Sequence, residues 1–446
     1  MSSTVISRRK FIYSSATLAA AAALPAFAQR TRKVPANEKL NIAIIGAGGR
    51  GADNLKAVST ENIVALCDVD MERAADSFKQ FPGAAQYTDW RRLLEREKNI
   101  DAVVISTPDH THATIAAAAL RAGKHVYCEK PLTRTIHEAR TLQNLASRGR
   151  LVTQMGQQGH ATEGTRRLVE TLRSGALGDV TEVHVWTDRP AGWWPQGVSR
   201  PRQRPRIPRT LDWDLWLGPA PLRPYNPIYV PFKWRGFYEY GTGAIGDMGV
   251  HNFDAAYWGL DLGVPIIAEV KESSEGTEDS PPLWSITELT FPKSGTKPPI
   301  KVTFYDGKKL PPTDLFQGET PTDNGALIIG KNGTIYQRTW HGGMGESDMF
   351  KFIGGDAPAE AQPTSKTQLP RSEAGHHQEW ILACKGQGKA MSDFNYASRL
   401  TESLLVGQLA IRTGKRIEWN AAKMRATNAP EADIFINPPY RKGWTL

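Results

Sequence analysis

The first part of the chain repeats one pattern, in which a short apolar run is followed by a stretch of helical periodicity. Short apolar strands that alternate with helices are typical of a parallel sheet covered by helices on both faces. The pattern therefore predicts an α/β domain over residues 39–157. Its predicted strands are 41–45, 62–67, 102–106 and 125–128, and its predicted helices follow residue 51 and lie near 71–80, 112–122 and 135–148.

Residues 158–446 lack this regular alternation. Val180 to Thr187 alternates apolar and polar residues, as a half-buried strand does. Between Arg189 and Lys233 the chain is rich in Pro, Arg and Trp, and a long irregular segment inside a compact domain is usually functional. We predict a second, α+β domain here. Its further strands are expected at 285–291, 300–305 and 326–329, and its helices at 162–173, 377–385 and 396–412.

Length and composition agree with two globular domains, since the chain has 446 residues of which 40% are hydrophobic and 23% charged. The formal net charge of +9 is not spread evenly. The densest basic cluster lies between prolines, and no nucleic-acid-binding motif accompanies it. We therefore expect a solvated loop, or a loop that covers the active site, rather than a nucleic-acid interface. The cluster contains Arg200, Arg202, Arg204, Arg206 and Arg209.

The N-terminus has the features of an export signal. Ser7-Arg8-Arg9-Lys10-Phe11 is a twin-arginine start, residues 16–26 are mildly apolar, and Ala26-Phe27-Ala28 is a small-x-small cleavage site. The apolar stretch is too short for a permanent membrane span. We predict a signal peptide over residues 1–28 and a linker over 29–38. The chain would then be exported folded by the twin-arginine machinery and act in the periplasm.

The cysteines and histidines predict neither disulfides nor a metal site. Cys67, Cys128 and Cys384 are scattered, which gives no disulfide framework and no metal-ligand spacing. Folding in the reducing cytoplasm before export would explain the lack of disulfides. Asp109-His-Thr-His112 contains metal-binding residue types, but no cysteine or acid nearby has the spacing of a zinc ligand.

Residues 46–51 read Gly-Ala-Gly-Gly-Arg-Gly directly after the first predicted strand and before a helix. In this context a Gly-x-Gly-x-x-Gly pattern provides a tight turn, backbone approach to a pyrophosphate, and close packing of helix on strand. The helix N-terminus attracts phosphates. We predict a doubly wound Rossmann domain, with a nucleotide-free fold of the same type as the alternative. Its first cofactor-binding candidates are Gly46, Gly48, Gly49, Arg50 and Gly51.

The cofactor is predicted from Asp68, which ends the second predicted strand. A carboxylate in this place accepts hydrogen bonds from the ribose hydroxyls and repels a 2′-phosphate. We therefore predict NAD(H) in preference to NADP(H).

Two further loops follow predicted strands, at the edge where open α/β sheets bind ligands. They are Ser106 to His112 and Cys128 to Leu132. A Glu-Lys pair is usually a surface ion pair, but at the end of a strand in a dinucleotide fold Lys130 is expected to face the nicotinamide. The cofactor-binding candidates in these loops are Thr107, Pro108, His112, Glu129 and Lys130.

Asp247 and His251 are four residues apart, after the glycine-rich residues 241–246. On a helix that begins near Gly246, both side chains would share one face. The tryptophans at 193, 194, 213 and 216 would either stack on sugar faces or pack the irregular segment down. The candidates for substrate contact are His160, Trp193, Arg235 and His377.

These residues resemble the glucose–fructose oxidoreductase and inositol dehydrogenase (Gfo/Idh/MocA) family. The resemblance extends over essentially all of the mature chain, from the glycine loop through Thr107-Pro108 and Glu129-Lys130-Pro131 to residues 246–251. It implies that Lys130, Asp247 and His251 are catalytic. It also implies a large, mostly antiparallel sheet in the second domain, a homo-dimer or homo-tetramer, and, in the branch with export signals, a tightly held nicotinamide cofactor.

We therefore expect an oxidoreductase that acts on a secondary alcohol of a carbohydrate or polyol. Oxidation of an alcohol requires a base for the proton and a donor that positions the oxygen; His251 suits the base, which Asp247 would orient, and Lys130 suits the donor. The sequence leaves open which of His251 and Lys130 takes the proton. An exported enzyme meets little free NAD(H), so its cofactor would be regenerated in place. The alternatives are a redox-neutral glycosidase that works by oxidation, elimination and reduction, and a noncatalytic NAD-retaining binding protein.

Overall fold

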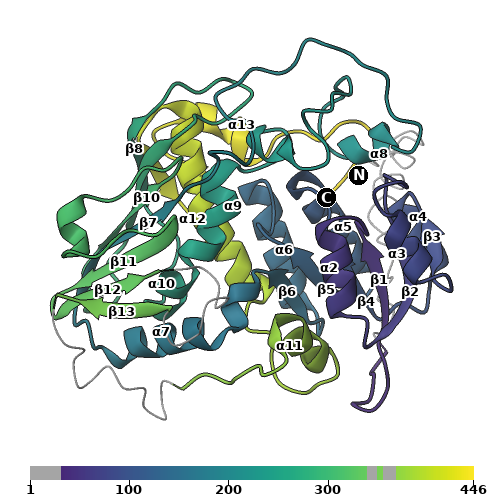
Figure 1. Cartoon of the computed structure of the whole chain (residues 1–446), viewed down its shortest axis with the longest axis horizontal. Coiled ribbons are helices and arrows are strands. Elements are labelled where there is room, and N and C mark those ends of the chain that lie inside the picture. The colour runs from purple at the N-terminus through teal and green to yellow at the C-terminus, as the bar shows by residue number, and fades with distance from the viewer. Residues whose placement is uncertain (1–31, 339–348, 355–367) are drawn as a thin grey trace, which may run out of the picture.

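Two sheets organise the protein, and they lie on either side of a band of helices in the computed structural model (Figure 1). The structure describes residues 32–338, 349–354 and 368–446. The predicted signal peptide at 1–28 lies outside the described residues. Within the described ranges, none of the helices combines the length and apolarity that crossing a bilayer requires.

The N-terminal sheet is fully parallel, with the strand order β3-β2-β1-β4-β5-β6. Its central strands are buried on both faces, which explains their continuous apolar runs. The order reverses between β1 and β4, and this switch point opens a crevice at their carboxyl ends. The strands are β1 Asn41–Ile45, β2 Asn62–Cys67, β3 Ala85–Tyr87, β4 Ala102–Ile105, β5 His125–Glu129 and β6 Thr153–Gly156; the helices are α2 Arg50–Ala57, α3 Ala75–Gln80, α4 Trp90–Arg96, α5 Asp109–Arg121 and α6 Ile136–Arg148.

The C-terminal sheet has nine strands in the order β13-β12-β11-β7-β10-β9-β8-β14-β15. All its pairings are antiparallel except β7 with β10. Strand β9 alternates buried and half-buried residues, as expected for one face packed on a core. The strands are β7 Val180–Thr187, β8 Ile267–Ser273, β9 Ser285–Phe291, β10 Ile300–Tyr305, β11 Asn324–Gly330, β12 Gly333–Gln337, β13 Phe350–Ile353, β14 Ile417–Asn420 and β15 Arg425–Ala426.

These two sheets confirm the predicted fold class, a Rossmann domain followed by a domain with a mostly antiparallel sheet. The helices of the second part are α7 Glu163–Ser174, α8 Trp213–Leu217, α9 Gly243–Asn252, α10 Asp254–Gly259, α11 Gly375–Cys384, α12 Phe394–Thr413 and α13 Asp433–Ile436, with the short 3₁₀ turns η1 Gln158–Ala161, η2 Lys233–Gly236, η3 Thr313–Phe316 and η6 Pro430–Ala432.

Two of the helix starts that differ from the prediction place site residues. Helix α5 begins at Asp109 rather than near 112, because Pro108 ends the preceding extended segment and Asp109 provides an acid in the first turn. Helix α9 begins at Gly243 rather than near Gly246, and Gly243 itself has a positive φ of 64°, which only glycine adopts easily. Asp247 is therefore in the second turn of α9.

Two helices of the C-terminal domain, α11 and α12, pack against the Rossmann domain. Trp380, Ile381 and Cys384 of α11 join one core with Ile42 of β1 and Tyr127 of β5. Helix α12, coloured yellow in Figure 1, crosses the middle of the molecule and packs on both α6 and α9. The two domains are thus joined through a continuous apolar core.

Candidate active site

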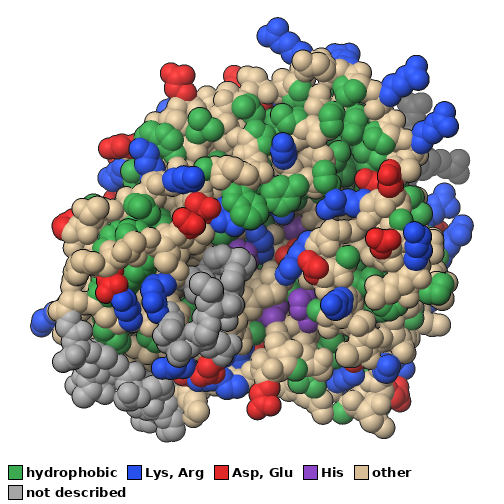
Figure 2. Space-filling view, in the orientation of Figure 1, with side chains coloured by type: hydrophobic (Ala, Val, Ile, Leu, Met, Phe, Trp, Pro, Cys, Tyr) green, Lys and Arg blue, Asp and Glu red, His purple; other side chains and the backbone are tan. Residues whose placement is uncertain are grey.

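A cavity of about 530 Å³ lies between the two domains at the carboxyl ends of the parallel strands. The surface in Figure 2 is hollowed between the domains, and basic, acidic and histidine side chains meet there. This volume is in the range of small-molecule sites. Among the predicted site residues, the wall contains Gly46, Gly48, Arg50, Asp68, Thr107, Pro108, Glu129, Lys130, Trp193, Arg235, Asp247 and His251.

The glycine loop forms the floor of one end of the cavity. Gly46 has a φ of 83°, which glycine alone adopts without strain. A β-carbon on Gly51 would lie 1.6 Å from the carbonyl oxygen of Gly46, so the turn closes only without a side chain there. The loop leads into α2, whose N-terminus is directed at the cavity wall. It therefore fits the pyrophosphate of a dinucleotide.

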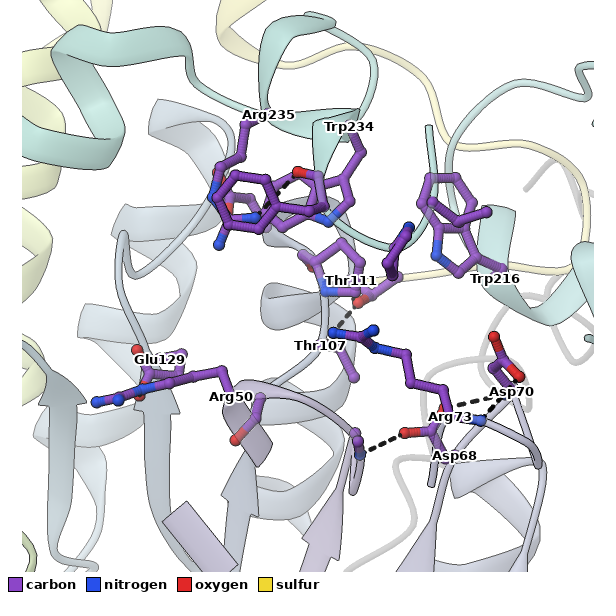
Figure 3. A pocket seen from close by; sticks show the side chains of 18 of the residues that line it. Arg50, Asp68, Asp70, Arg73, Thr107, Thr111, Glu129, Trp216, Trp234 and Arg235 are labelled. Carbon is purple, nitrogen blue, oxygen red and sulfur yellow. Dashed lines mark hydrogen bonds and ion pairs between the residues drawn. The ribbon is translucent and has the colours of Figure 1, made fainter. Parts of the chain in front are cut away.

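Asp68 holds the edge of this floor through backbone N–H groups. Its Oδ2 accepts a hydrogen bond from Gly48 N at 2.9 Å, and its Oδ1 accepts one from Asp70 N at 2.9 Å. Burial raises the pKa of this carboxyl above its ordinary value, and the two N–H groups oppose that shift. Figure 3 shows Asp68 and Asp70 beside Arg73 at this end of the cavity. The fixed carboxylate is suited to a ribose diol.

Glu129, at the end of β5, organises the middle of the cavity. Its Oε1 accepts hydrogen bonds from Asn54 Nδ2 at 2.9 Å, Gln158 Nε2 at 3.0 Å and Arg50 Nε at 3.1 Å. Burial alone would raise the pKa of Glu129, but the positive charges of Arg50 and Lys130 and the hydrogen bonds from Asn54 and Arg50 hold it below its ordinary value. The Glu129 carboxylate is therefore a fixed negative charge under the cavity, between the glycine loop and Lys130.

His112 does not line the cavity; it fastens the two loops that do. Its Nε2 lies 2.8 Å from the carbonyl oxygen of Thr107, and its Nδ1 lies 2.9 Å from that of Pro131. Burial lowers the pKa of this imidazole. The predicted contact with the cofactor is therefore replaced by a positioning contact, which holds the loop before α5 against the loop that carries Lys130.

Three charged side chains from distant segments meet at the other end of the cavity. Lys130 Nζ lies 3.1 Å from Asp247 Oδ1 and donates to the Asp247 carbonyl oxygen at 3.0 Å. Arg235 Nε donates to the same Oδ1 at 3.0 Å. Burial would raise the pKa of Asp247, but these two cations outweigh it and keep the carboxyl ionised. The resulting cluster is fixed and carries a net positive charge.

His251 follows Asp247 by one turn on α9, as the spacing predicted, and both side chains line the cavity. Asp109 is a wall residue that the sequence analysis missed as a site candidate. Its Oδ2 accepts a hydrogen bond from Thr242 Oγ1 at 3.2 Å, and burial raises its pKa to about 8. Asp109 reaches the cavity because α5 begins at this residue, three residues before the predicted start of the helix.

Aromatic side chains from residues 189–236 cover the cavity opposite the glycine loop. Trp193 is 46% exposed, and the guanidinium of Arg189 lies 3.9 Å from the centre of its ring. The Arg235 guanidinium lies 4.2 Å from the ring of Phe232 and 4.3 Å from that of Trp234. Figure 3 shows Trp234 and Arg235 above the cavity and Arg50 and Asp68 below it. A flat apolar surface beside fixed charges suits a polyhydroxylated ring.

The remaining predicted residues are not part of the cavity wall. Within the described residues, the cavity wall does not include Gly49, Gly51, His112, His160 or His377. His160 is fully buried, with Nδ1 2.8 Å from Asp254 Oδ2 and its ring stacked on Trp258. His377 Nε2 lies 2.9 Å from Asn54 Oδ1, and burial lowers its pKa to about 4. Both histidines support the site from outside the cavity. Tertiary packing decides where their side chains point, and their spacing in the sequence does not reveal it.

The basic cluster divides into a paired and an exposed part. Arg200 forms ion pairs with Glu239 and Asp279. The four other arginines of the cluster are exposed on the segment that arches over the top of the molecule in Figure 1. The arrangement agrees with a solvated loop beside the cavity.

Family models match nearly the whole described chain. Residues 40–157 match the model of an oxidoreductase family with an NAD-binding Rossmann fold, and residues 162–446 match the C-terminal α/β domain of the same family. Inositol 2-dehydrogenase 2 of Saccharopolyspora erythraea is 34% identical over 161 residues, which are 35% of this chain and 47% of that protein. Inositol 2-dehydrogenase of Salmonella typhimurium is 32% identical over 151 residues, which are 32% of this chain and 45% of that protein. The chain thus matches about half the length of these relatives.

Solved structures share the fold at low sequence identity. A dehydrogenase named WlbA from Chromobacterium violaceum, solved with NADH and UDP-GlcNAcA, matches with a TM-score of 0.60 and 17% identity, over 87% of this chain and 99% of that one. An aldose-aldose oxidoreductase from Caulobacter crescentus matches with a TM-score of 0.57 and 16% identity, over 86% of this chain and 100% of that one. Because both domain models match in order along one chain, the protein belongs to the Gfo/Idh/MocA family of oxidoreductases.

Proposed function

We propose that the protein oxidises or reduces a secondary alcohol of a carbohydrate or polyol with a tightly held NAD(H). The observation that carries this proposal is that Lys130, Asp247 and His251 line the same cavity as the glycine loop. One end of the cavity then holds the dinucleotide, and the other places a base and a hydrogen-bond donor where the substrate would bind.

Lys130 is proposed to bind the reacting oxygen. An ammonium group has three donors, and Asp247 takes two of them through its carboxylate and its carbonyl oxygen. The third is available for the substrate oxygen, where the positive charge stabilises developing negative charge. A bound nicotinamide would supply the hydride acceptor. With Lys130 as an ammonium the hydroxyl proton would pass to His251, and with Lys130 as a neutral amine it would pass to Lys130 itself. Asp247 keeps Lys130 in place in either case.

The substrate class follows from the aromatic cover and from the relatives. Trp193 offers an exposed ring face, and apolar ring faces pack on the C–H faces of sugars. The similar proteins include inositol dehydrogenases and an aldose-aldose oxidoreductase, so polyols and aldoses are the first substrates to test. NAD(H) is proposed over NADP(H) because the Asp68 carboxylate lies at the edge where the ribose would bind.

We also propose that the twin-arginine signal directs the folded, cofactor-loaded protein to the periplasm. The pool of NAD(H) there is small, so the cofactor would be reduced and reoxidised within one catalytic cycle. A second sugar that returns the hydride satisfies this requirement, and so does a redox-neutral cleavage of a glycoside.

Two measurements test the proposal. First, the mature protein is purified without added nucleotide and its small molecules are released by acid; we expect a nicotinamide dinucleotide, and its absence would contradict tight retention. Second, sugars, polyols and aryl glycosides are screened while the absorbance of the bound nicotinamide is followed. Conversion of a sugar with a change in the nicotinamide supports the oxidoreductase. Glycoside cleavage without net redox change would replace it by the glycosidase.

A further inference from the structure

Residues 209–218, here called the strap, cross from the second domain onto the end of β2. Met71 N donates to the Thr210 carbonyl oxygen at 3.0 Å, and Asp212 N donates to the Val69 carbonyl oxygen at 2.8 Å. Asp70 and Leu211 form an isolated antiparallel bridge between these bonds. The strap is therefore fastened to the residues that directly follow Asp68.

The inner side of the strap forms part of the cavity wall. Leu211, Leu215 and Trp216 line the cavity together with Thr88 and Trp90 of the Rossmann domain. At the far end of the strap, the Trp216 carbonyl oxygen lies 2.9 Å from His110 Nε2 of α5. The strap thus closes the cavity at the Asp68 end, where the adenosine half of a dinucleotide binds in this fold.

The C-terminal tail, residues 437–446, fastens the strap to the Rossmann domain a second time. Arg441 Nη1 lies 2.6 Å from Asp214 Oδ1, and Arg441 Nη2 donates to the Asp214 carbonyl oxygen at 2.6 Å. Arg441 is 14% exposed. Three residues later, the centre of the Trp444 ring lies 6.3 Å from the centre of the Trp90 ring. The guanidinium of Arg91 lies 4.7 Å from the centre of the Trp444 ring. In Figure 1 the yellow tail crosses the top of the molecule and ends beside α5 and α8.

We propose that the strap and the C-terminal tail form a clasp over the adenosine end of the cofactor site, so that the dinucleotide enters and leaves only when the clasp opens. The inference rests on the proposed NAD(H) site and adds the residues that set its exchange rate. All clasp bonds described above join protein atoms, and Arg441 and Trp444 are not among the residues that line the cavity. They can affect the cofactor only through the position of the strap.

This arrangement makes a kinetic prediction that a simple contact does not. Weakening the clasp eases opening in both the free and the loaded protein, so the rates of association and dissociation rise together. A residue that touched the cofactor would instead change the dissociation rate and the affinity, with little change in the association rate. The ratio of the two rates therefore distinguishes a clasp from a contact.

The test compares the variants Arg441→Ala and Trp444→Ala with Lys442→Ala, which removes an exposed positive charge from the same tail. NADH association and dissociation are followed by stopped-flow fluorescence on the full mature protein freed of nucleotide. We expect both rates to rise by about tenfold or more in the first two variants, since a charge-assisted hydrogen-bond set or an aromatic contact is lost. Lys442→Ala is expected to stay within about twofold of the wild type.

Hydrogen exchange provides a readout that needs no cofactor. The amides of Met71 and Asp212, whose hydrogen bonds join the strap to the residues after β2, should exchange faster in Arg441→Ala, while the thermal midpoint shows that the variant is folded. If the wild type binds NADH but Arg441→Ala and Trp444→Ala leave the rates and the hydrogen exchange unchanged, the clasp is overturned and the proposed function is not affected. A rise in dissociation without a rise in association would also overturn the clasp. A wild type that binds no NADH would overturn the clasp together with the proposed function.

Discussion

The two walls of the cavity are built by different means. The cofactor wall comes from strand ends and loops between residues 46 and 129, and the contacts of its glycine loop involve backbone groups, such as Gly48 N with Asp68. The substrate wall comes from Lys130 and residues 189–251, and its contacts are between side chains of different segments, such as Arg235 and Lys130 on Asp247. The first wall depends on local chain geometry, and the second depends on tertiary packing.

The strongest test of the cofactor wall is Gly51→Ala. The added β-carbon would lie 1.6 Å from a backbone oxygen, so the loop must open. We expect loss of NADH binding at concentrations that saturate the wild type, measured by fluorescence titration. Gly83→Ala is the matched control, because a β-carbon there meets no atom within 4 Å. Normal NADH binding by Gly51→Ala would show that the turn does not carry the cofactor.

On the substrate wall, Lys130→Met should separate chemistry from cofactor binding. It removes the donor for the substrate oxygen, while Asp247 keeps its ion pair with Arg235. We expect turnover to fall by a factor of about a thousand, the upper end for loss of one such donor. Fluorescence titration should find NADH still bound. Lys98→Met, at an exposed position, is the control, and near-normal turnover of Lys130→Met would remove its assigned role.

On the cofactor wall, a smaller effect is expected for the preference for NAD over NADP. Asp68→Asn keeps the shape and one of the two oxygens that accept from the backbone N–H groups of Gly48 and Asp70, but it removes the charge. We expect the ratio of NAD to NADP affinity to fall about tenfold to a hundredfold, because charged hydrogen bonds to the ribose are lost and repulsion of a 2′-phosphate ends. Titration with both dinucleotides measures the ratio. An unchanged ratio would place the discrimination elsewhere.

Asp109 links stability to pH. Burial raises its pKa to about 8, with Arg235 and Lys130 lowering it and Asp247 raising it. Between its ordinary pKa and about pH 8, Asp109 is protonated in the folded state and ionised in the unfolded state. Its contribution to stability therefore declines as the pH rises toward about 8 and levels off above that pH. Asp109→Asn should remove this part of the decline.

The measurement for Asp109 is the difference in thermal midpoint between variant and wild type, from about pH 6 to about pH 9. The difference should shift in favour of Asp109→Asn as the pH rises. Asp306, another buried carboxyl with a pKa of about 7, is present in both proteins and cancels in the comparison. A constant difference would mean that Asp109 is ionised throughout.

The smallest effect is expected from Trp193→Ala. Loss of an aromatic face should raise KM by a few-fold, about 1 kcal/mol in binding, and leave kcat unchanged. Trp284→Ala is the control, since Trp284 also stacks with a cation, Lys309, but does not line the cavity. Steady-state kinetics measure KM and kcat for both variants. A change in kcat alone would argue against Trp193 as a binding surface for the substrate.

The contrast between the walls also explains what the sequence could predict. Periodicity and the glycine spacing located β1, α2 and β2, because strand–turn–helix geometry is encoded within a few residues. The three-residue strand β3 and helix α4 carry too little periodicity to be recognised. Spacing placed Asp247 and His251 together, but no local signal indicated that Arg235 would pair with Asp247 or that His160 would be buried on Trp258. Those positions are decided by long-range packing.

Helix α11 has a consequence for how the chain is made. Its Trp380 and Ile381 complete the apolar core beneath the Rossmann sheet, although they lie more than two hundred residues after that sheet ends. During synthesis the N-terminal half emerges first, and at that stage one face of its sheet is uncovered. We expect the nucleotide-binding half to become stable only after the ribosome has finished most of the chain. Loading of the dinucleotide would then be a late event that reports on completion of the whole polypeptide.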